Sequence, residues 1–241
     1  MTQTQAIEGP TSEQQIRAKK MLLTVGLFSI VMMFAAFSSA YIVIRNSTSY
    51  WVNISMPQEF FTSTILILLS SVTIFFANRF LKKGNNSLAI GLTALTLVLG
   101  SMFCFQQYQG FQKLADLNMT LTGNSLMNIK GVYGQDYVIT TSEGETLSMI
   151  NGDYFKPGES DPVTNDVHGM HNGAASYFNG LVILHVLHVA VGILFLLLLV
   201  IWLLIKTVNK DRPLWMQQVA RYWHFVDGLW LYLFLFLYLI H

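Results

Sequence analysis

Histidine is the residue type with the widest chemical repertoire in this sequence, and three histidines lie within long apolar stretches. His185 and His188 stand three positions apart, so on a helix both imidazoles share one face, about 12 Å from the nearer end of their stretch. His224 stands three positions before Asp227. Imidazoles ligate haem iron and transition metals, and a histidine beside a carboxylate can form an ion pair or relay a proton. Each of these four side chains is therefore a candidate functional residue.

A metal or haem site built on His185 and His188 lacks its remaining ligands in this sequence. A bis-histidine haem needs a further histidine on a facing helix, and His224 is the candidate within the apolar stretches. Cys104 is the single cysteine, and no paired carboxylates accompany the histidines. We therefore expect neutral histidines that hydrogen-bond across helices or to a neighbouring subunit, with a haem or metal site as the alternative.

His224 and Asp227 open the last apolar stretch, next to Tyr222 and Trp223. Their spacing puts them on one helix face, where each can satisfy the other in a low dielectric. A proton relay would need a continuous chain of such groups, and the apolar residues that follow do not continue it. We expect a structural pair or a lipid-headgroup contact here, with the two aromatic residues as anchors at the interface.

His168 and His171 share the three-residue spacing but lie in a polar segment with no third ligand nearby, so we expect a solvated loop. The sequence contains no phosphate-binding glycine loop, nucleophile elbow, Cys-x-x-Cys or His-Glu-x-x-His. An accessory subunit is therefore a more economical interpretation than an enzyme that works alone.

Composition predicts the elements that position these residues. Of 241 residues, 53% are hydrophobic and 11% are charged, whereas soluble chains are about 25% charged. This balance excludes a secreted disulfide scaffold, a disordered chain and a nucleic-acid binder. Five stretches reach the roughly 20 residues that a helix needs to cross a membrane, and they are residues 22–44, 60–81, 88–110, 177–205 and 219–240.

The predicted fold is an all-α membrane protein, a bundle of five transmembrane helices with a small extracytoplasmic insertion. We divide the chain into residues 1–21 (a mobile cytoplasmic tail), 22–110 (three helices), 111–176 (an acidic insertion) and 177–241 (two helices). Lysine and arginine predict the orientation, because ten of the 14 fall on one side if the N-terminus is cytoplasmic, and four on the other. The C-terminus is then periplasmic.

The insertion carries eight acidic residues against three lysines. Residues 137–141 and 146–150 are β-prone and flank a short glycine-containing loop, so they predict a hairpin. Sixty-odd residues with few large apolar side chains would be marginal alone, so we expect a small cap that rests on a neighbour.

The last two spans resemble the third subunit of haem–copper oxidases, cytochrome c oxidase subunit III. Residues 222–227 (YWHFVD), followed by Trp230 and an aromatic run, are similar to the terminal helix of that family. Residues 176–178 (SYF) and 185–189 (HVLHV) resemble its serine-aromatic and His-x-Leu-His-Val pattern. Gln107 suits the glutamine-containing helix, and Arg45 fits the first shared helix.

The five-span layout is similar to the short bacterial form, which lacks two N-terminal helices. Ile30 stands where the family commonly has an intramembrane glutamate, so a role for that glutamate in proton handling does not transfer. Gly110 lies near the place of a second family glutamate, and the insertion is longer than the short form usually carries.

The resemblance implies a non-catalytic subunit that packs on subunit I, binds phospholipid and supports proton uptake in a proton-pumping oxidase of a bacterial cytoplasmic membrane. It implies no cofactor in this chain, and haem and copper in subunits I and II. The negative charge of the insertion separately suggests a docking surface for a basic cytochrome c or another respiratory complex. The chain then has no catalytic, cofactor or metal residues. The expected structural, lipid or subunit contacts are His185, His188, Tyr222, Trp223, His224, Asp227, Gln107 and Arg45.

Several alternatives stay open from the sequence. Within the family, the electron donor could be a quinol, or the complex a nitric oxide reductase. Outside it, a membrane haem protein would use His185, His188 and His224, and a small transporter would show inverted repeats, which this sequence lacks.

Overall fold

The computed structural model describes residues 12–120, 126–170, 173–205 and 212–240. Within these residues, five helices are long and apolar enough to cross a membrane, as predicted. They are α1 (Ser12–Ser47), α2 (Gln58–Lys82), α3 (Asn86–Asp116), α5 (Gly173–Leu204) and α6 (Arg212–Ile240). The predicted all-α membrane fold is confirmed, and the chain is a multi-pass membrane protein.

The helices extend beyond the predicted spans, most of all at the start of α1. Residues 12–21, which we assigned to a mobile tail, are the first turns of this helix. They include glutamate, glutamine, alanine and lysine, which favour a helix even in water. Residues 1–11 of the predicted tail lie outside the described part of the chain.

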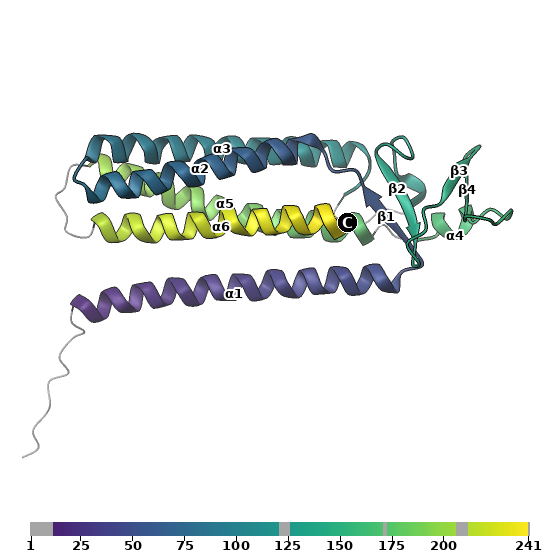
Figure 1. The fold of residues 1–241 in the computed structure, drawn as a ribbon, viewed down its shortest axis with the longest axis horizontal. Helices are drawn as coiled ribbons and strands as arrows, with labels where there is room; N and C mark the ends of the chain where they lie inside the picture. Colours follow the sequence, from purple (N-terminus) through teal and green to yellow (C-terminus); the bar gives the residue numbers. More distant parts are fainter. Residues whose placement is uncertain (1–11, 121–125, 171–172, 206–211, 241) are drawn as a thin grey trace, which may run out of the picture.

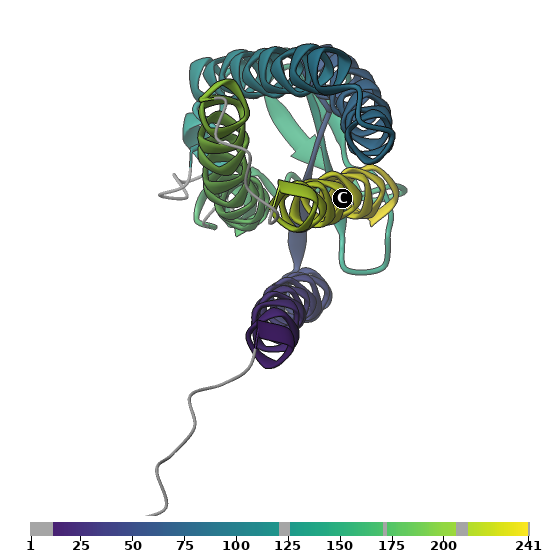
Figure 2. The ribbon, with the colours of Figure 1, turned by 90° about the vertical axis from the view of Figure 1, so that its left-hand side faces the viewer.

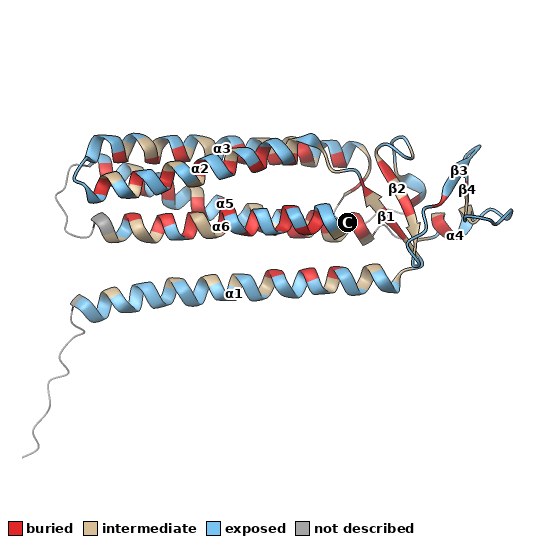
Figure 3. Ribbon diagram, viewed as in Figure 1, coloured by how far each residue is buried: buried red, intermediate tan, exposed pale blue. Residues whose placement is uncertain are grey.

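Four helices form a bundle, and the fifth stands beside it. Figure 2 looks along the helices and shows α2, α3, α5 and α6 around a common centre, with α1 set apart below them. The burial colours in Figure 3 agree, since buried residues follow the four bundle helices whereas most of α1 is exposed. The core therefore belongs to the bundle, and α1 touches mainly α5 and α6.

Trp223 on α6 lies at the centre of this core and is fully buried. Its ring packs against the backbone of Gly100 on α3 and of Gly192 on α5. A Cβ added at Gly100 would lie 2.7 Å from the ring, and one added at Gly192 would lie 3.0 Å from it. Its indole N–H donates to Ser70 Oγ on α2 at 2.9 Å. One side chain thus contacts the other three helices of the bundle.

A short cap covers one end of the bundle and is built from two connections (Figure 1). Strand β1 (Tyr50–Ile54) comes from the α1–α2 connection and pairs antiparallel with β2 (Tyr137–Thr141) from the insertion. Strands β3 (Ser148–Ile150) and β4 (Asp153–Phe155) form a second antiparallel pair. A 3-10 turn (Leu126–Asn128) and the helix α4 (Thr164–His168) complete the cap.

The hairpin predicted at residues 137–150 forms only in part. The chain does reverse after β2, where Thr141 N–H donates to the Glu145 carbonyl at 2.8 Å and Leu147 N–H to the Ile139 carbonyl at 2.9 Å. The long partner of β2 is β1, whose Trp51, Val52 and Ile54 are buried, whereas residues 148–150 are exposed. Residues 148–150 instead turn at Asn151 and Gly152, both with positive φ, and pair with β4.

The contact of Trp223 with two glycines predicts a graded response to alanine. We expect Gly100→Ala to lower the free energy of unfolding by about 1–3 kcal/mol through overpacking, and Gly192→Ala to lower it less, because its Cβ would lie farther from the ring. Thermal unfolding of the purified chain in detergent measures this. Gly91→Ala on α3, where a Cβ meets no atom within 4 Å, is the control and should not destabilise. Equal stability of all three variants would contradict the tight packing of the Trp223 ring against Gly100 and Gly192.

Candidate functional site

Hydroxyl groups along α2 form hydrogen bonds with polar side chains of the neighbouring helices. Gln107 Nε2 on α3 donates to Ser63 Oγ at 2.9 Å, and Trp230 Nε1 on α6 donates to Thr64 Oγ1 at 2.9 Å. Like Ser70 under Trp223, both hydroxyls also donate to carbonyls of their own helix, Ser63 at 2.9 Å and Thr64 at 2.7 Å. This back-bonding leaves each oxygen free to accept, so α2 serves as a row of acceptors inside the bundle.

His224 uses the same row. Its Nδ1 lies 2.7 Å from Ser71 Oγ in a hydrogen bond. The predicted pairing with Asp227 does not form: Asp227 is buried, and its carboxyl group lies beside the Ser71 hydroxyl, with no hydrogen bond to His224 among the described residues. The three-residue spacing correctly places both residues on one helix face. The His224 imidazole nevertheless points toward α2, where the Ser71 hydroxyl orients its ring.

His185 and His188 occupy different surroundings although they are one turn apart. His185 is fully buried, with its ring 5.2 Å from that of Trp230 and 6.1 Å from that of Phe103, and neither ring nitrogen has a partner in the described chain. His188 faces α1, with its ring 5.8 Å from that of Phe34 and its Nδ1 2.7 Å from its own helix carbonyl at Leu184. Neither imidazole hydrogen-bonds across helices within the described residues, and a hydrogen bond to a neighbouring subunit stays a prediction.

Tyr222 and Arg45 connect helix backbones. The Tyr222 hydroxyl donates to the carbonyl of His188 at 3.0 Å, which joins α6 to α5. Arg45, near the end of α1, donates from its guanidinium to the carbonyl of Ile240 at the end of α6. The cap end of α1 is thus attached to the bundle by a charged hydrogen bond that satisfies a helix-terminal carbonyl.

Histidine, cysteine and carboxylate side chains do not gather into a ligand set in the described chain. No three of them are placed so that they could hold a metal ion there. His168 ends α4 and packs edge-on against Tyr154, with 6.0 Å between the ring centroids, whereas its predicted neighbour His171 lies outside the described residues. The predicted metal alternatives therefore gain no support from geometry.

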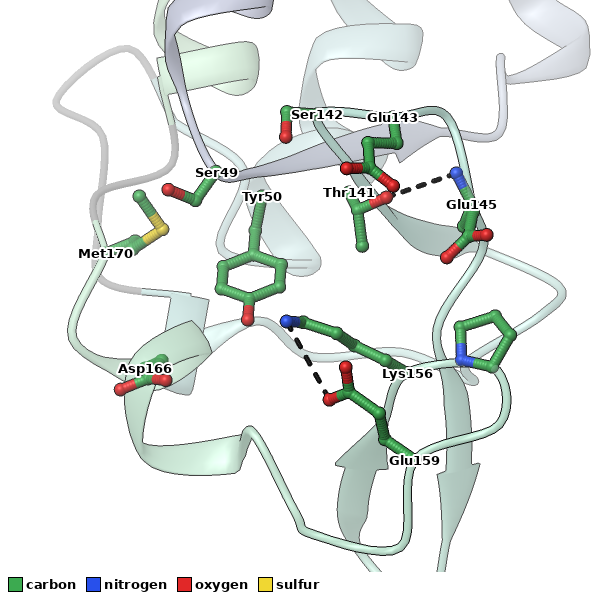
Figure 4. Close-up of a pocket in the computed structure, with 11 residues that line it drawn as sticks. Ser49, Tyr50, Thr141, Ser142, Glu143, Glu145, Lys156, Glu159, Asp166 and Met170 are labelled. Atoms are coloured by element: carbon green, nitrogen blue, oxygen red, sulfur yellow. Dashed lines mark hydrogen bonds and ion pairs between the residues drawn. The ribbon is translucent and has the colours of Figure 1, made fainter.

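The cap holds a polar cavity of about 600 Å³ (Figure 4). Lys156 crosses it and lies 3.8 Å from Glu159, and the Glu145 N–H donates to Thr141 Oγ1 at 3.2 Å on the far wall. Carboxylates outnumber the lysine among its lining residues, which are Ser49, Tyr50, Thr141, Ser142, Glu143, Glu145, Lys156, Pro157, Glu159, Asp166 and Met170. The cavity therefore presents negative charge outside the membrane.

These features define a polytopic membrane protein in which buried polar groups join helices and a charged cap faces the water. Sequence similarity to known proteins narrows this class. Cytochrome c oxidase subunit 3 of Prototheca wickerhamii is 24% identical over 188 residues, 78% of this chain and 52% of that protein. Cytochrome c oxidase subunit 3 of Loxodonta africana is 25% identical over 199 residues, 79% and 55%. A probable quinol oxidase subunit 3 of Staphylococcus saprophyticus is 34% identical over 80 residues, 30% and 40%.

The resemblance to cytochrome c oxidase subunit III is thus confirmed, at low identity and over most of the chain. The chain spans about half the length of the curated relatives it matches. No family model matches it.

Sequence reasoning found the polar residues but missed several of their partners. It assigned no role to the hydroxyl groups of α2 or to residues 50–54. Four of the five residues 50–54 (YWVNI) are aromatic or β-branched, a composition that favours a strand. The role of Ser70 and Ser71 as hydrogen-bond partners of α6 has no sequence signal, because it depends on which helix faces α2.

The Ser71–His224 bond allows a direct test of this acceptor row. We expect Ser71→Ala to lower the free energy of unfolding by about 0.6 kcal/mol, and by at most about 1.7, the range for hydrogen bonds between membrane helices. Ser101→Ala on α3 is the control, because Ser101 is exposed and donates only to its own helix at Leu97. Steric-trap or denaturant unfolding in detergent measures both. A loss at Ser101 as large as at Ser71 would argue against an interhelical role.

Proposed function

We propose that the chain is a non-catalytic accessory subunit of a haem–copper terminal oxidase in a bacterial cytoplasmic membrane. The observation that carries this proposal is the match of cytochrome c oxidase subunit 3 relatives over more than three quarters of the chain. The placement of the shared residues supports it, since His224, Trp223 and Gln107 serve helix contacts.

The chain would stabilise the catalytic subunit by packing against it in the membrane. The bundle buries its own polar groups and leaves its outer surface apolar, with large side chains such as Phe28, Leu68, Phe105 and Leu198 exposed. Such a surface suits lipid and neighbouring helices. In this role, subunits I and II would carry the haem and copper, and this chain would hold neither. Support of proton uptake would come through the packing, because Ile30 replaces the family's glutamate.

The proposed orientation has the N-terminus in the cytoplasm and the cap in the periplasm. It follows from the lysine and arginine bias, ten against four. The pairing of β1 with β2 supports the alternation of the spans, because it brings the α1–α2 and α3–α5 connections together at the same end of the bundle.

The electron donor of the complex has two candidates. Most of the relatives above are cytochrome c oxidase subunits, and the Staphylococcus relative, named a probable quinol oxidase subunit, favours a quinol as the second candidate. Its match is limited to 30% of the chain, so we take cytochrome c as the leading donor. A role in a nitric oxide reductase has no such support.

Histidine substitution separates the accessory role from a haem-binding role. We expect an oxidase complex that carries His188→Ala to keep its full haem and copper content, because the His188 ring packs on Phe34 and hydrogen-bonds its own helix at Leu184, and no three possible metal ligands gather in the described chain. Absorbance spectroscopy and metal analysis of the affinity-purified complex measure this. Loss of haem absorbance from a complex that still contains this chain would contradict the proposal, and so would a Soret band from the purified chain alone.

The acidic cap could guide a basic electron donor to the complex by long-range attraction. We expect Glu143→Gln with Glu145→Gln to raise the KM for cytochrome c several-fold at low ionic strength and to leave kcat unchanged, since both residues line the cavity of Figure 4. The difference should vanish in high salt. Glu13→Gln, at the opposite end of the bundle, is the control. An unchanged KM in the cap variant would remove the docking role.

A further inference from the structure

A mostly apolar cavity of about 430 Å³ lies between α1 and α6, within the membrane-spanning part of both helices. These helices border the gap that Figure 2 shows between α1 and the bundle. The cavity is almost three times as large as the roughly 150 Å³ that hold a benzene molecule in a protein core. Its walls carry mainly small and aromatic side chains, and they are Val31, Phe34, Ala35, His224, Phe225, Gly228, Leu229 and Tyr232.

His224 brings a ring nitrogen without a partner to this cavity. Its Nδ1 faces α2 and lies 2.7 Å from Ser71 Oγ. Its Nε2, on the opposite side of the ring, makes no hydrogen bond within the described residues. The residues of α1 in the wall (Val31, Phe34 and Ala35) have apolar side chains that cannot pair with it. A hydrocarbon chain in the cavity would leave Nε2 unpaired, which costs free energy, whereas a ligand with a polar oxygen would satisfy it.

The groups behind His224 allow Nε2 to act as a donor or as an acceptor. Other hydroxyls of α2 donate to their own helix, as Ser70 does to Ile67 at 2.7 Å and Thr73 to Ser70 at 2.8 Å. Ser71 makes no such bond in the described chain, and the buried carboxyl of Asp227 lies beside its hydroxyl. The Ser71 proton can therefore point to either neighbour.

The two directions of this hydrogen bond give His224 two tautomers. When Ser71 donates to Asp227, it accepts from Nδ1–H of His224, and Nε2 carries a lone pair. When Ser71 donates to Nδ1, Nε2 carries the proton. The cavity therefore presents a hydrogen-bonding group that suits an oxygen either as a hydroxyl or as a carbonyl.

A membrane quinone has the chemistry that this cavity requires. It is lipophilic, so it reaches the site through the bilayer, and its flat ring suits walls that contain Phe34, Phe225 and Tyr232. Its ring oxygens are carbonyls in the oxidised form and hydroxyls in the reduced form. A phospholipid acyl chain offers no group for Nε2, and a water molecule needs at least two polar partners.

We propose that this cavity binds the ring of a membrane quinone, in its quinone or its quinol form. One ring oxygen bonds to His224 Nε2, and the isoprenoid tail extends into the lipid. Ser71 and Asp227 are positioning residues that set the tautomer of His224. The site goes beyond the accessory role, and it does not depend on which donor supplies electrons to the complex.

Menadione and 2-methylnaphthalene are matched probes for this site, because they share a methylated two-ring skeleton and only menadione carries carbonyl oxygens. Equilibrium binding of each radiolabelled probe to the purified full chain in detergent measures the affinities. We expect His224→Phe to weaken menadione binding about three- to tenfold, as for the loss of one hydrogen bond, and to change 2-methylnaphthalene binding less than about twofold. Comparison within each probe removes their different solubilities in detergent.

His188→Phe is the matched control, since His188 also lies beside α1 but does not line the cavity. It should leave menadione binding unchanged. Equal losses of both probes in His224→Phe would overturn the proposal, because they would indicate a change in packing and not a lost hydrogen bond. A loss of menadione binding in His188→Phe as large as in His224→Phe would overturn it too.

Gly228→Leu tests the location of the site and leaves His224 in place. A Cβ at Gly228 meets no atom within 4 Å, so leucine can enter the cavity, and leucine favours a helix more than glycine does. We expect the variant to fold, as circular dichroism would show, and to lose menadione binding. Gly91→Leu on α3, where a Cβ also meets no atom, should keep it.

Retained menadione binding in a folded Gly228→Leu chain would place the ligand elsewhere and overturn the proposal. The chain is tested alone, whereas the oxidase role is scored by co-purification of haem–copper subunits. Failure of the quinone site therefore does not count against the accessory role.

Discussion

The bundle depends on the packing of one large side chain, that of Trp223, between two glycines on neighbouring helices. Trp223 fits only because Gly100 and Gly192 let α3 and α5 approach its ring, and its N–H is satisfied only because Ser70 on α2 can accept. In a membrane there is no hydrophobic force between helices, so close packing and buried hydrogen bonds must hold them together. The Trp223 contact combines close packing and a buried hydrogen bond in one side chain. Other hydroxyl groups of α2 make further hydrogen bonds of this kind to α3 and α6.

The polar groups of the bundle are divided into satisfied and unsatisfied sets. Gln107, Trp230 and His224 each bond to a hydroxyl of α2. Neither ring nitrogen of the buried His185 has a partner in the described chain, and Asp227 has beside it only the Ser71 hydroxyl that already bonds His224. The first set explains how four helices adopt one arrangement. The second set marks the positions where buried polar groups lack hydrogen bonds within the described chain. A hydrogen bond from water or from a neighbouring subunit would stabilise the structure most at these positions.

Hydropathy alone predicted the five spans and their order, because crossing a membrane requires long apolar runs that few other structures need. The family motifs led to the residues that join α5 and α6. The sequence could not predict which side chains hydrogen-bond to one another. The spacing of His224 and Asp227 suits a pair, but the rotation of α6 brings His224 to Ser71. The β1–β2 sheet was missed for a related reason, since its strands are separated by more than eighty residues and pair only after three helices are placed.

That separation has a consequence for synthesis. β1 leaves the ribosome long before β2, so its backbone groups stay unpaired while α2 and α3 are made. The sheet can close only once β2 has reached the cap end of the bundle, and the Arg45 contact with Ile240 can form only after α6 is complete. Two of the contacts that hold the first helix in place are therefore made late, and a stall in synthesis before then would leave β1 with an unpaired edge that is prone to aggregation.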